Sequence, residues 1–479
     1  MSPSNSPSQV RSVGMALWFS PRGGSAQVAR YLGQALQDHG VAVELAVGSL
    51  GPVGALGNAE TFFGGRIPLA PMAYDQAVAD WHAGADPMDS AVPLHPSYEF
   101  KPDVPDRVLT AVSAEQLAHA VRAWTRHLAA APGFAQSDVL HIHHLGVLQL
   151  AARAAAPHAP IVTHVHGTEL KLLEEIERGT PGVADQPHVA AAVALLREAA
   201  AASDAFVTNS PHDRDEAVRL LGIDPDVTHG LTNGVDVERF APLTLTGAEQ
   251  HAHWRRWLVE DPRGWDSATG EPGSIRADEV DVDRCFAPID GEPRTVLLFV
   301  GRFLGFKRVP LLVRAYARAR EHFHETAPLV IWGGAPGEWE GEHPHDVARE
   351  LGVGDVFFAG WRGHDELPLG LACSAGLVAP SVDEPFGQVY LEAMASERAL
   401  IGTTTGGPPS FINVHEGAPD GWLVAPDDEA ALADALVAMV NDPVERRARG
   451  ANGLTHVRAQ FAWSAVAERF LEVYASVLR

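Results

Sequence analysis

Two glutamates stand eight residues apart around a proline and a glycine in the stretch VDEPFGQVYLEAMASE (382–397). Glu384 falls in a predicted loop, and Glu392 falls about two turns inside the predicted helix that follows. Upstream, FVGRFLGFKR supplies Arg302 and Lys307, and Lys307 is one of only three lysines in the chain. Two cations and a helix amino end suit a diphosphate, and one carboxylate on either side suits the hydroxyl groups of two sugars.

These side chains follow predicted strands of one sheet. In open parallel sheets, ligands bind beyond the carboxyl ends of the strands, where helix amino ends offer N–H groups. The turn after a third strand carries Gly406 and Gly407, where backbone can approach a ligand closely. The helix N–H groups expected to face the phosphates lie at Phe386, Gly387, Gln388 and Val389. Either glutamate alone is equally consistent with helix capping or a surface ion pair, but the combination favours a binding site.

Histidines gather near two predicted strand ends in the first half of the chain, in HIHHLG and HVHG. They are His141, His143, His144, His164 and His166. The spacing resembles a zinc cluster, and the alternatives are packing or an acceptor pocket. Asp281 and Asp283 form another carboxylate pair, but they lie outside any predicted strand. We expect no metal at either place, and we assign a functional role to His166, because the glycine after it ends its strand.

The elements that must position these residues alternate between strand and helix, starting with VGMALWFS, a glycine turn and an amphipathic helix. This rhythm predicts an α/β chain with two Rossmann-like domains in tandem. We expect a first domain at 1–237 with a long insertion at about 48–112, an elongated linker or insertion at 238–293, a second domain at 294–460, and a final helix at 461–479 that crosses back to the first domain.

Composition narrows the function classes. Of 479 residues, 46% are apolar and 20% are charged, which is typical of a globular protein. The net charge of −25 argues against nucleic acid or anionic lipid as a partner. The two cysteines form no disulfide framework, and we find no targeting or membrane-spanning segment, so we expect a cytoplasmic protein with small-molecule partners. A homo-oligomer remains open.

The motifs GRFLGFK, EPFGQVYLEAMA, TGG and NGVD resemble those of retaining glycosyltransferase family 4. The resemblance covers nearly the whole second domain and extends more loosely to the first, through Gly23 with Gly24 and through HVHGT. It implies the GT-B fold, in which two Rossmann-like domains face a central cleft. It also implies hexosyl transfer with retention from a nucleoside-diphosphate sugar, UDP- or GDP-linked, without a metal or other cofactor.

Residue roles follow from this resemblance. Arg302 and Lys307 clamp the diphosphate and stabilise the leaving nucleoside diphosphate, Glu384 holds the donor sugar, and Glu392 holds the ribose. His166 is expected beside the anomeric carbon. The turn at Gly23 and Gly24 lets backbone reach the phosphates. Trp361 or Arg362, in the loop AGWRGHDEL, is our candidate for stacking on the base.

The acceptor is predicted to be a small polar molecule such as a cyclitol, a sugar or a natural-product scaffold. His95 and Tyr98 in the first insertion, together with Thr168, are the candidate acceptor residues, and surface elaboration or an oligomer contact is the alternative for the insertion. Two rival functions remain: a sugar-nucleotide epimerase of similar build, which needs no acceptor, and a catalytically silent nucleotide-sugar binding protein.

Overall fold

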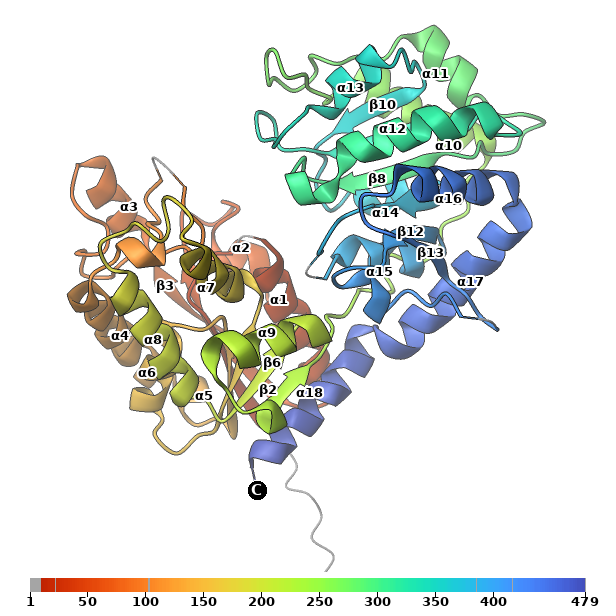
Figure 1. The fold of residues 1–479 in the computed structure, drawn as a ribbon. Helices are drawn as coiled ribbons and strands as arrows, with labels where there is room; N and C mark the ends of the chain where they lie inside the picture. Colours follow the sequence, from red (N-terminus) through yellow and green to blue (C-terminus); the bar gives the residue numbers. More distant parts are fainter. Residues whose placement is uncertain (1–9, 22, 102–103, 385, 416, 479) are drawn as a thin grey trace, which may run out of the picture. The chain divides into compact units, whose positions relative to one another are not determined.

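The computed structural model describes residues 10–21, 23–101, 104–384, 386–415 and 417–478. The chain folds into two compact units (Figure 1). The first comprises Met1–Gly234 together with Trp463–Arg479, and the second comprises Val235–Ala462. Each is built on its own parallel sheet, so the α/β class with two Rossmann-like domains is confirmed.

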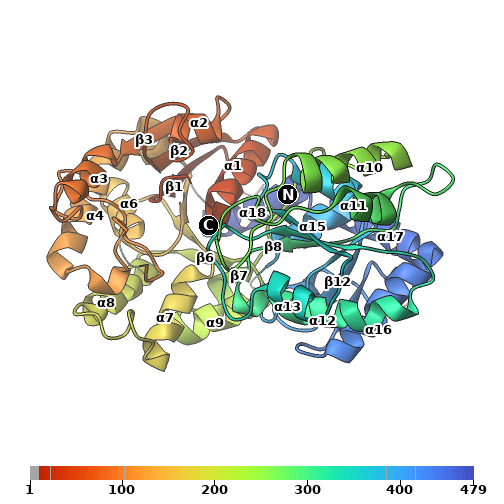
Figure 2. The ribbon, with the colours of Figure 1, turned by 90° about the horizontal axis from the view of Figure 1, so that it is seen from above.

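The first unit contains a seven-stranded parallel sheet in the order β3-β2-β1-β4-β5-β6-β7. The strands are β1 (Ser12–Leu17), β2 (Ala42–Ser49), β3 (Leu69–Ala73), β4 (Val139–His143), β5 (Ile161–Val165), β6 (Ala205–Thr208) and β7 (Thr228–Gly230). The central strands β4 and β5 are fully buried, because helices cover the sheet on both faces, as Figure 2 also shows.

Helices α1 and α18 pack against each other, and α4, α6 and α8 form a second contacting group. The helices of this unit are α1 (Gly23–Asp38), α2 (Ala59–Phe63), α3 (Asp75–His82), α4 (Ala114–Ala129), α5 (Pro132–Ala135), α6 (Val147–Ala155), α7 (Thr168–Arg178), α8 (Val189–Ala201), α9 (Pro211–Leu221) and α18 (Trp463–Val477). The last of them, α18, follows the second unit in sequence but belongs to the first: its Tyr474 hydroxyl lies 2.7 Å from Nδ1 of His141 on β4.

The segment at 48–112, expected as an insertion, instead supplies part of the first sheet. It contains β3, which pairs in parallel with β2, as well as α2 and α3. The expectation was wrong because β3 carries Pro71, and proline argues against a strand in a sequence reading. The strand lies at the sheet edge, where a missing N–H donor is tolerated.

The second unit contains a six-stranded parallel sheet in the order β10-β9-β8-β11-β12-β13. Its strands are β8 (Leu297–Gly301), β9 (Leu329–Gly333), β10 (Val356–Gly360), β11 (Gly376–Val378), β12 (Ala399–Thr403) and β13 (Gly421–Val424). Its helices are α10 (Gly247–Arg255), α11 (Glu279–Phe286), α12 (Val309–Ala319), α13 (Pro344–Glu350), α14 (Leu367–Ala372), α15 (Gln388–Ala395), α16 (Glu429–Asn441) and α17 (Pro443–Gln460). Successive residues of β8 alternate between two apolar clusters, Leu297 and Phe299 in one and Leu298 in the other.

Residues 238–293, expected as an elongated linker or insertion, form part of the second unit and are not a linker. They fold into α10, a π-helical turn (Arg256–Glu260) and α11. Trp254 and Trp257 are fully buried and join Trp332 of β9 in one apolar cluster. The indole ring centroids of Trp257 and Trp332 lie 4.9 Å apart. The segment therefore completes the core of this unit.

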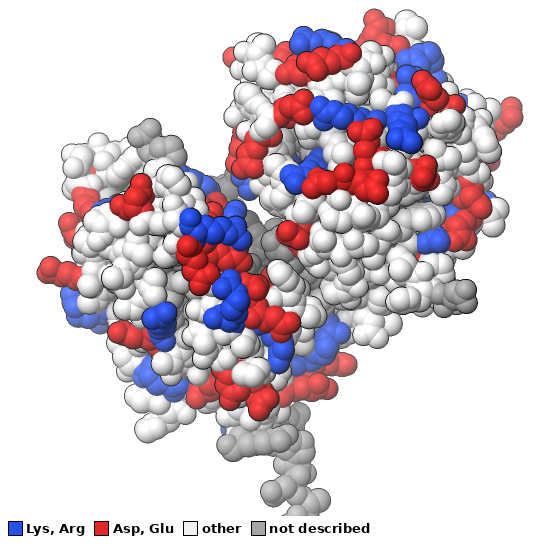
Figure 3. Space-filling model, in the orientation of Figure 1, with Lys and Arg blue, Asp and Glu red and all other residues white. Residues whose placement is uncertain are grey.

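Among the described residues, no helix combines the length and the apolar character needed to cross a bilayer. On the face drawn in Figure 3, acidic and basic side chains are interspersed, and the described residues form no continuous basic surface there.

Candidate functional site

The strand order of the second sheet reverses direction between β8 and β11, and ligands of such folds bind at this switch point. Lys307 follows β8 in a short 3₁₀ turn, and Glu384 follows β11. The Lys307 ammonium contacts the Glu384 carboxylate, and the two side chains are only 16% and 9% exposed. Both residues thus lie at strand ends of one sheet, as expected from the sequence, and their direct contact is an additional finding.

Backbone hydrogen bonds tie three loops together around this pair. Val382 N–H donates to the carbonyl of Phe306 at 2.7 Å, and Gly407 N–H donates to the carbonyl of Glu384 at 2.7 Å. Gly406 adopts a φ of 72°, and a Cβ atom there would lie 2.5 Å from the Glu384 carbonyl oxygen. Only glycine permits this approach, so the loop after β12 fixes the backbone of Glu384.

The helix after Glu384, α15, begins without a side-chain cap. Its N-cap residue, Gly387, has a φ of 84° and no side chain, and Gln388 and Val389 form its first positions. Phe386 is buried with its ring centroid 5.6 Å from that of Phe411, so this side chain serves the core. The α15 amino end thus offers backbone N–H groups and a partial positive charge beside Lys307.

Glu392 lies inside α15 and is buried, and its Oε1 is 2.9 Å from Nε2 of His364. Sequence reasoning missed His364, although it stands in the quoted loop AGWRGHDEL. Trp361 in the same loop is 56% exposed. The exposed Trp361 indole offers a stacking surface, and the Glu392 carboxylate offers a hydrogen-bond acceptor.

Arg362 was wrongly considered for stacking on a base, because its guanidinium is buried and already fully engaged. It donates to the carbonyls of Ala359 at 3.1 Å and Trp257 at 2.8 Å, and it also contacts Asp261. It therefore joins the π-helical turn to the loop after β10 and holds that loop in place.

Arg302 does not join Lys307 and Glu384. Its side chain is half-exposed and pairs with Glu338, in the loop after β9. An isolated parallel β-bridge pairs Phe303 with Trp339, and the Glu340 N–H donates to the Phe303 carbonyl at 2.8 Å. These contacts join the loop after β8 to the loop after β9. The two cations of the expected clamp thus lie in the same loop after β8, but they pair with separate carboxylates, Glu338 and Glu384.

His343 supports the loop that carries Glu338. Its ring centroid lies 4.7 Å from that of Trp265, and its Nδ1 accepts from the His345 N–H at the start of α13. Burial lowers the pKa of His343 to about 4. Because the unfolded chain has the ordinary pKa near 6.5, the second unit should lose stability as pH falls from about 6.5 to about 4.

We expect the His343 imidazole to account for up to about 3 kcal/mol of this loss. The free energy of unfolding measured by denaturant titration at pH 7.5 and pH 4.5 tests it. In His343→Asn, which keeps a side-chain cap but does not titrate, the loss between the two pH values should be smaller by that amount. An equal loss in the parent chain and the variant would contradict the prediction.

In the first unit, the glycine turn after β1 opens α1. Gly23 is the first residue of this helix, and a Cβ atom on Gly24 would have no neighbour within 4 Å among the described residues. The packing of the described residues therefore gives no reason for glycine at Gly24.

His166 lies just after β5, with its Nε2 3.0 Å from Nδ1 of His143. Burial, followed by repulsion from His164, His144 and the other nearby histidines, holds the pKa of His166 well below its ordinary value. The ring is therefore neutral near pH 7 and suits hydrogen bonding rather than charge pairing.

His95 and Tyr98 are buried, so these two side chains are not part of the surface. The Tyr98 hydroxyl donates to the Leu145 carbonyl at 2.7 Å, and its ring stacks on His144. The ring centroids of His95 and Phe19 are 4.8 Å apart. This segment therefore packs over the carboxyl ends of β1 and β4, at the switch point of the first sheet.

Two buried carboxyl groups nearby were missed by sequence reasoning. Glu169 accepts from the Thr168 hydroxyl at 3.1 Å and from the Leu145 N–H at 3.1 Å, and its Oε1 is 3.0 Å from Nδ1 of His144. Burial raises the pKa of Glu169, but the charge and hydrogen bond of His144 outweigh it and keep the pKa low. Burial raises the pKa of Asp213 to about 6. In the sequence, both residues look like common acidic residues in the first turn of a helix. The only feature that could have pointed to them is their position shortly after β5 and β6.

Comparison with known protein families gives two matches. The model for Glycosyltransferase Family 4 matches residues 22–239, and the model for Glycosyl transferases group 1 matches residues 294–442. A D-inositol 3-phosphate glycosyltransferase of Stackebrandtia nassauensis is 30% identical over 356 residues, which cover 73% of this chain and 70% of that protein.

Solved structures share the fold at low sequence identity. Sucrose-phosphate synthase from Thermosynechococcus elongatus superposes with a TM-score of 0.60 at 18% identity, covering 97% of this chain and 98% of the other. Anabaena Alr3699/HepE, solved in complex with UDP-glucose, gives a TM-score of 0.58 at 15% identity over 97% and 99% of the two chains. The family matches, the relative and the switch-point geometry agree, and the chain belongs to glycosyltransferase family 4 and is a glycosyltransferase.

Proposed function

We propose that the chain transfers a hexosyl group, with retention, from a UDP- or GDP-linked sugar to a hydroxyl of a small polar acceptor, with a cyclitol phosphate as the first candidate. The acceptor class is supported by the relative named D-inositol 3-phosphate glycosyltransferase. The donor class is supported by the likeness to a protein solved with UDP-glucose. The observation that carries the proposal is the contact of Lys307 with Glu384 beside the uncapped start of α15.

In this proposal, the donor diphosphate binds Lys307, the first N–H groups of α15 and Arg302. Arg302 must then exchange Glu338 for a phosphate. The free-energy cost of this exchange is small, because both side chains are about half-exposed and exposed ion pairs contribute about 0–1 kcal/mol. A bidentate contact from guanidinium to phosphate is stronger than that pair.

The sugar side of the donor lies at Glu384 and the nucleoside side at Glu392. Glu384 accepts from sugar hydroxyls, and its contact with Lys307 keeps it oriented. When the glycosidic bond to phosphate breaks, negative charge builds up on the diphosphate, and Lys307 together with the helix dipole stabilises it. The acceptor hydroxyl attacks from the same face, and a phosphate oxygen takes its proton.

In the first domain, His166 offers a neutral imidazole to the donor sugar, and the turn at Gly23 and Gly24 offers backbone N–H groups to the phosphates. His95, Tyr98 and Thr168 lie around the proposed acceptor position. Because Tyr98 and His95 are buried, they shape the wall of that position through packing.

Glu392 is proposed to accept hydrogen bonds from the ribose diol. We expect Glu392→Gln to raise the dissociation constant of the nucleotide about tenfold or more, because hydrogen bonds to a charged group contribute about 1.5–3 kcal/mol. Isothermal titration with the free nucleoside diphosphate measures the effect. As a control, Glu397→Gln changes a carboxylate just beyond α15 and should leave binding unchanged. Equal affinity in Glu392→Gln and the parent chain would remove Glu392 from the site.

Incubation with UDP- and GDP-linked hexoses, with and without myo-inositol 3-phosphate, tests the whole proposal. Release of nucleoside diphosphate that depends on the acceptor, with an α-linked product from an α-linked donor, is the expected result. Isomerised donor without an acceptor would instead support an epimerase, and nucleotide binding without turnover across an acceptor panel would support a binding protein. Either outcome would contradict the proposal.

A further inference from the structure

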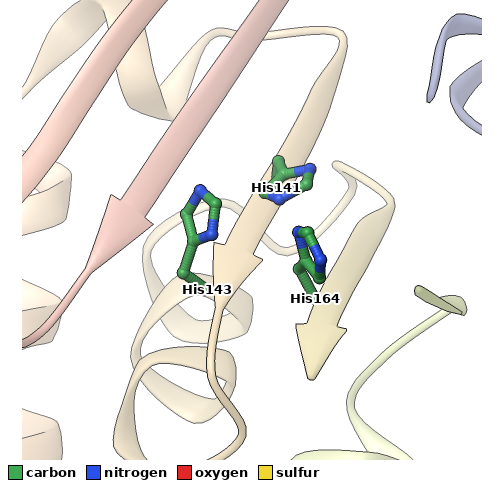
Figure 4. Close-up of side chains that lie close together, drawn as sticks. All are labelled: His141, His143 and His164. Carbon is green, nitrogen blue, oxygen red and sulfur yellow. The ribbon is translucent and has the colours of Figure 1, made fainter. Parts of the chain in front are cut away.

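Three histidines lie close together on two neighbouring strands of the first sheet (Figure 4). His141 and His143 belong to β4 and His164 to β5, and strand pairing sets His143 opposite His164. All three side chains are fully buried. One ring nitrogen from each lies within 4.8 Å of the others.

In each ring, one nitrogen is engaged and the other is not. The engaged contacts are His141 Nδ1 with the Tyr474 hydroxyl at 2.7 Å, His143 Nδ1 with His166 Nε2 at 3.0 Å, and His164 Nε2 with Asn209 Oδ1 at 3.0 Å. Within the described parts of the chain, the remaining nitrogens, His141 Nε2, His143 Nε2 and His164 Nδ1, have no hydrogen-bond partner. Buried polar atoms without partners are rare, and three within one cluster call for an explanation.

The tautomers follow from the engaged contacts. The Asn209 carbonyl oxygen only accepts, so His164 must carry its proton on Nε2 and present a lone pair on Nδ1. The Tyr474 oxygen can accept a hydrogen bond from Nδ1–H of His141, and His166 Nε2 can accept one from Nδ1–H of His143. Each ring would then keep one lone pair free for a metal ion, within a buried cluster in which one nitrogen of each ring lies within 4.8 Å of the others. Metal-binding histidines have this arrangement, since they donate their second ring N–H to a partner that orients them.

Contrary to the expectation from the sequence, we propose that His141, His143 and His164 form a site for one divalent transition metal ion, with Zn²⁺ as the occupant. Imidazole nitrogens suit Zn²⁺ and not Mg²⁺ or Ca²⁺, which take oxygen ligands. With Zn–N distances of about 2.0–2.1 Å, three tetrahedral ligands stand about 3.4 Å apart, so small side-chain rotations from the present spacing close the site.

Three protein ligands leave the fourth position of a tetrahedral ion to a water molecule. Because the three side chains are fully buried, we assign the ion a role in holding the two strands together. It joins β4 to β5, and through Tyr474 and Asn209 it also anchors α18 and the start of the loop after β6. The ion also fixes His143 with its proton on Nδ1, donating to His166. His166, the candidate residue for the donor sugar, is then held in a single orientation by a chain of two imidazoles.

Elemental analysis of the full-length protein tests the site with zinc itself. After dialysis against a chelator and then against buffer with about 1 µM free Zn²⁺, we expect one zinc per chain and a melting temperature several degrees above that of the stripped protein. Replacement by Co²⁺ should give visible absorption bands typical of a tetrahedral nitrogen site. His343→Asn alters an equally buried histidine of the second domain and should retain the full zinc content.

Two variants test the assignment. His164→Gln removes a ligand and should abolish zinc retention; circular dichroism checks that it folds. Asn209→Ala keeps all three ligands but removes the partner of His164, and it should weaken zinc binding about 10–100-fold. A folded parent chain without zinc, or equal zinc affinity in the parent chain and in folded His164→Gln or Asn209→Ala, would overturn the proposal. Sugar transfer is measured separately, so failure of the zinc site leaves the proposed function standing.

Discussion

A Lys307→Gln variant is expected to transfer sugar at least about a hundredfold more slowly than the parent chain at saturating donor and acceptor. A preorganised charge facing the leaving diphosphate contributes on the order of 3 kcal/mol in the transition state. Lys307 is held for this role by Glu384 and by the ring of Phe306, which lies 5.0 Å from its Nζ. The turnover number, measured as acceptor-dependent nucleotide release, tests the prediction.

Loss of Lys307 also leaves the buried Glu384 carboxylate without its partner, which by itself costs about 3–5 kcal/mol of stability. The double variant Lys307→Gln, Glu384→Gln removes both charges, so we expect it to regain the parent melting temperature while remaining inactive. Arg314→Gln removes a cation that pairs with Glu342 on the surface of the same domain, and it should leave turnover unchanged. Turnover within about threefold of the parent in a folded Lys307→Gln would exclude Lys307 from the leaving-group site.

Much of the fold could be predicted because its strands are buried on both faces. Runs such as LLFVG and LVIWG are continuously apolar and lie between helical segments, which is typical of parallel sheets. The strand β3 escaped prediction because Pro71 broke its pattern, and its place at the edge depends on tertiary contacts. Residues 238–293 were misread because their tryptophans become core only when β9 provides Trp332.

The candidate site was only partly predictable. Lys307 and Glu384 could be placed at one edge of the sheet from sequence, because each follows a strand and the carboxyl ends of parallel strands share one edge, but their direct contact was not predicted. The partners of the other charged groups could not be deduced: Arg302 contacts Glu338, and Glu392 contacts His364, and each pair lies 28 to 36 residues apart in sequence. The burial of Arg362 could not be predicted either. It depends on the π-helical turn, where the Trp257 carbonyl accepts a hydrogen bond from the Arg362 guanidinium.

Replacing Gly406 by alanine is expected to reduce turnover by about a hundredfold, although this residue has no side chain to bind anything. The new Cβ would lie 2.5 Å from the Glu384 carbonyl oxygen and 2.6 Å from its backbone nitrogen, so the Glu384 loop must move. A displacement near 1 Å at a reacting group costs about a hundredfold in rate. Turnover at saturating substrates, together with the melting temperature, measures the effect.

The left-handed backbone adds a second penalty of about 1–2 kcal/mol in stability, which must be separated from the displacement of Glu384. Gly352 provides the matched control, since it has a φ of 66° and a Cβ there would meet no atom within 4 Å. We expect Gly352→Ala to lose a similar amount of stability and keep full turnover. If Gly406→Ala matched Gly352→Ala in turnover, the loop after β12 would not position Glu384, and the carboxylate would be held by Lys307 alone.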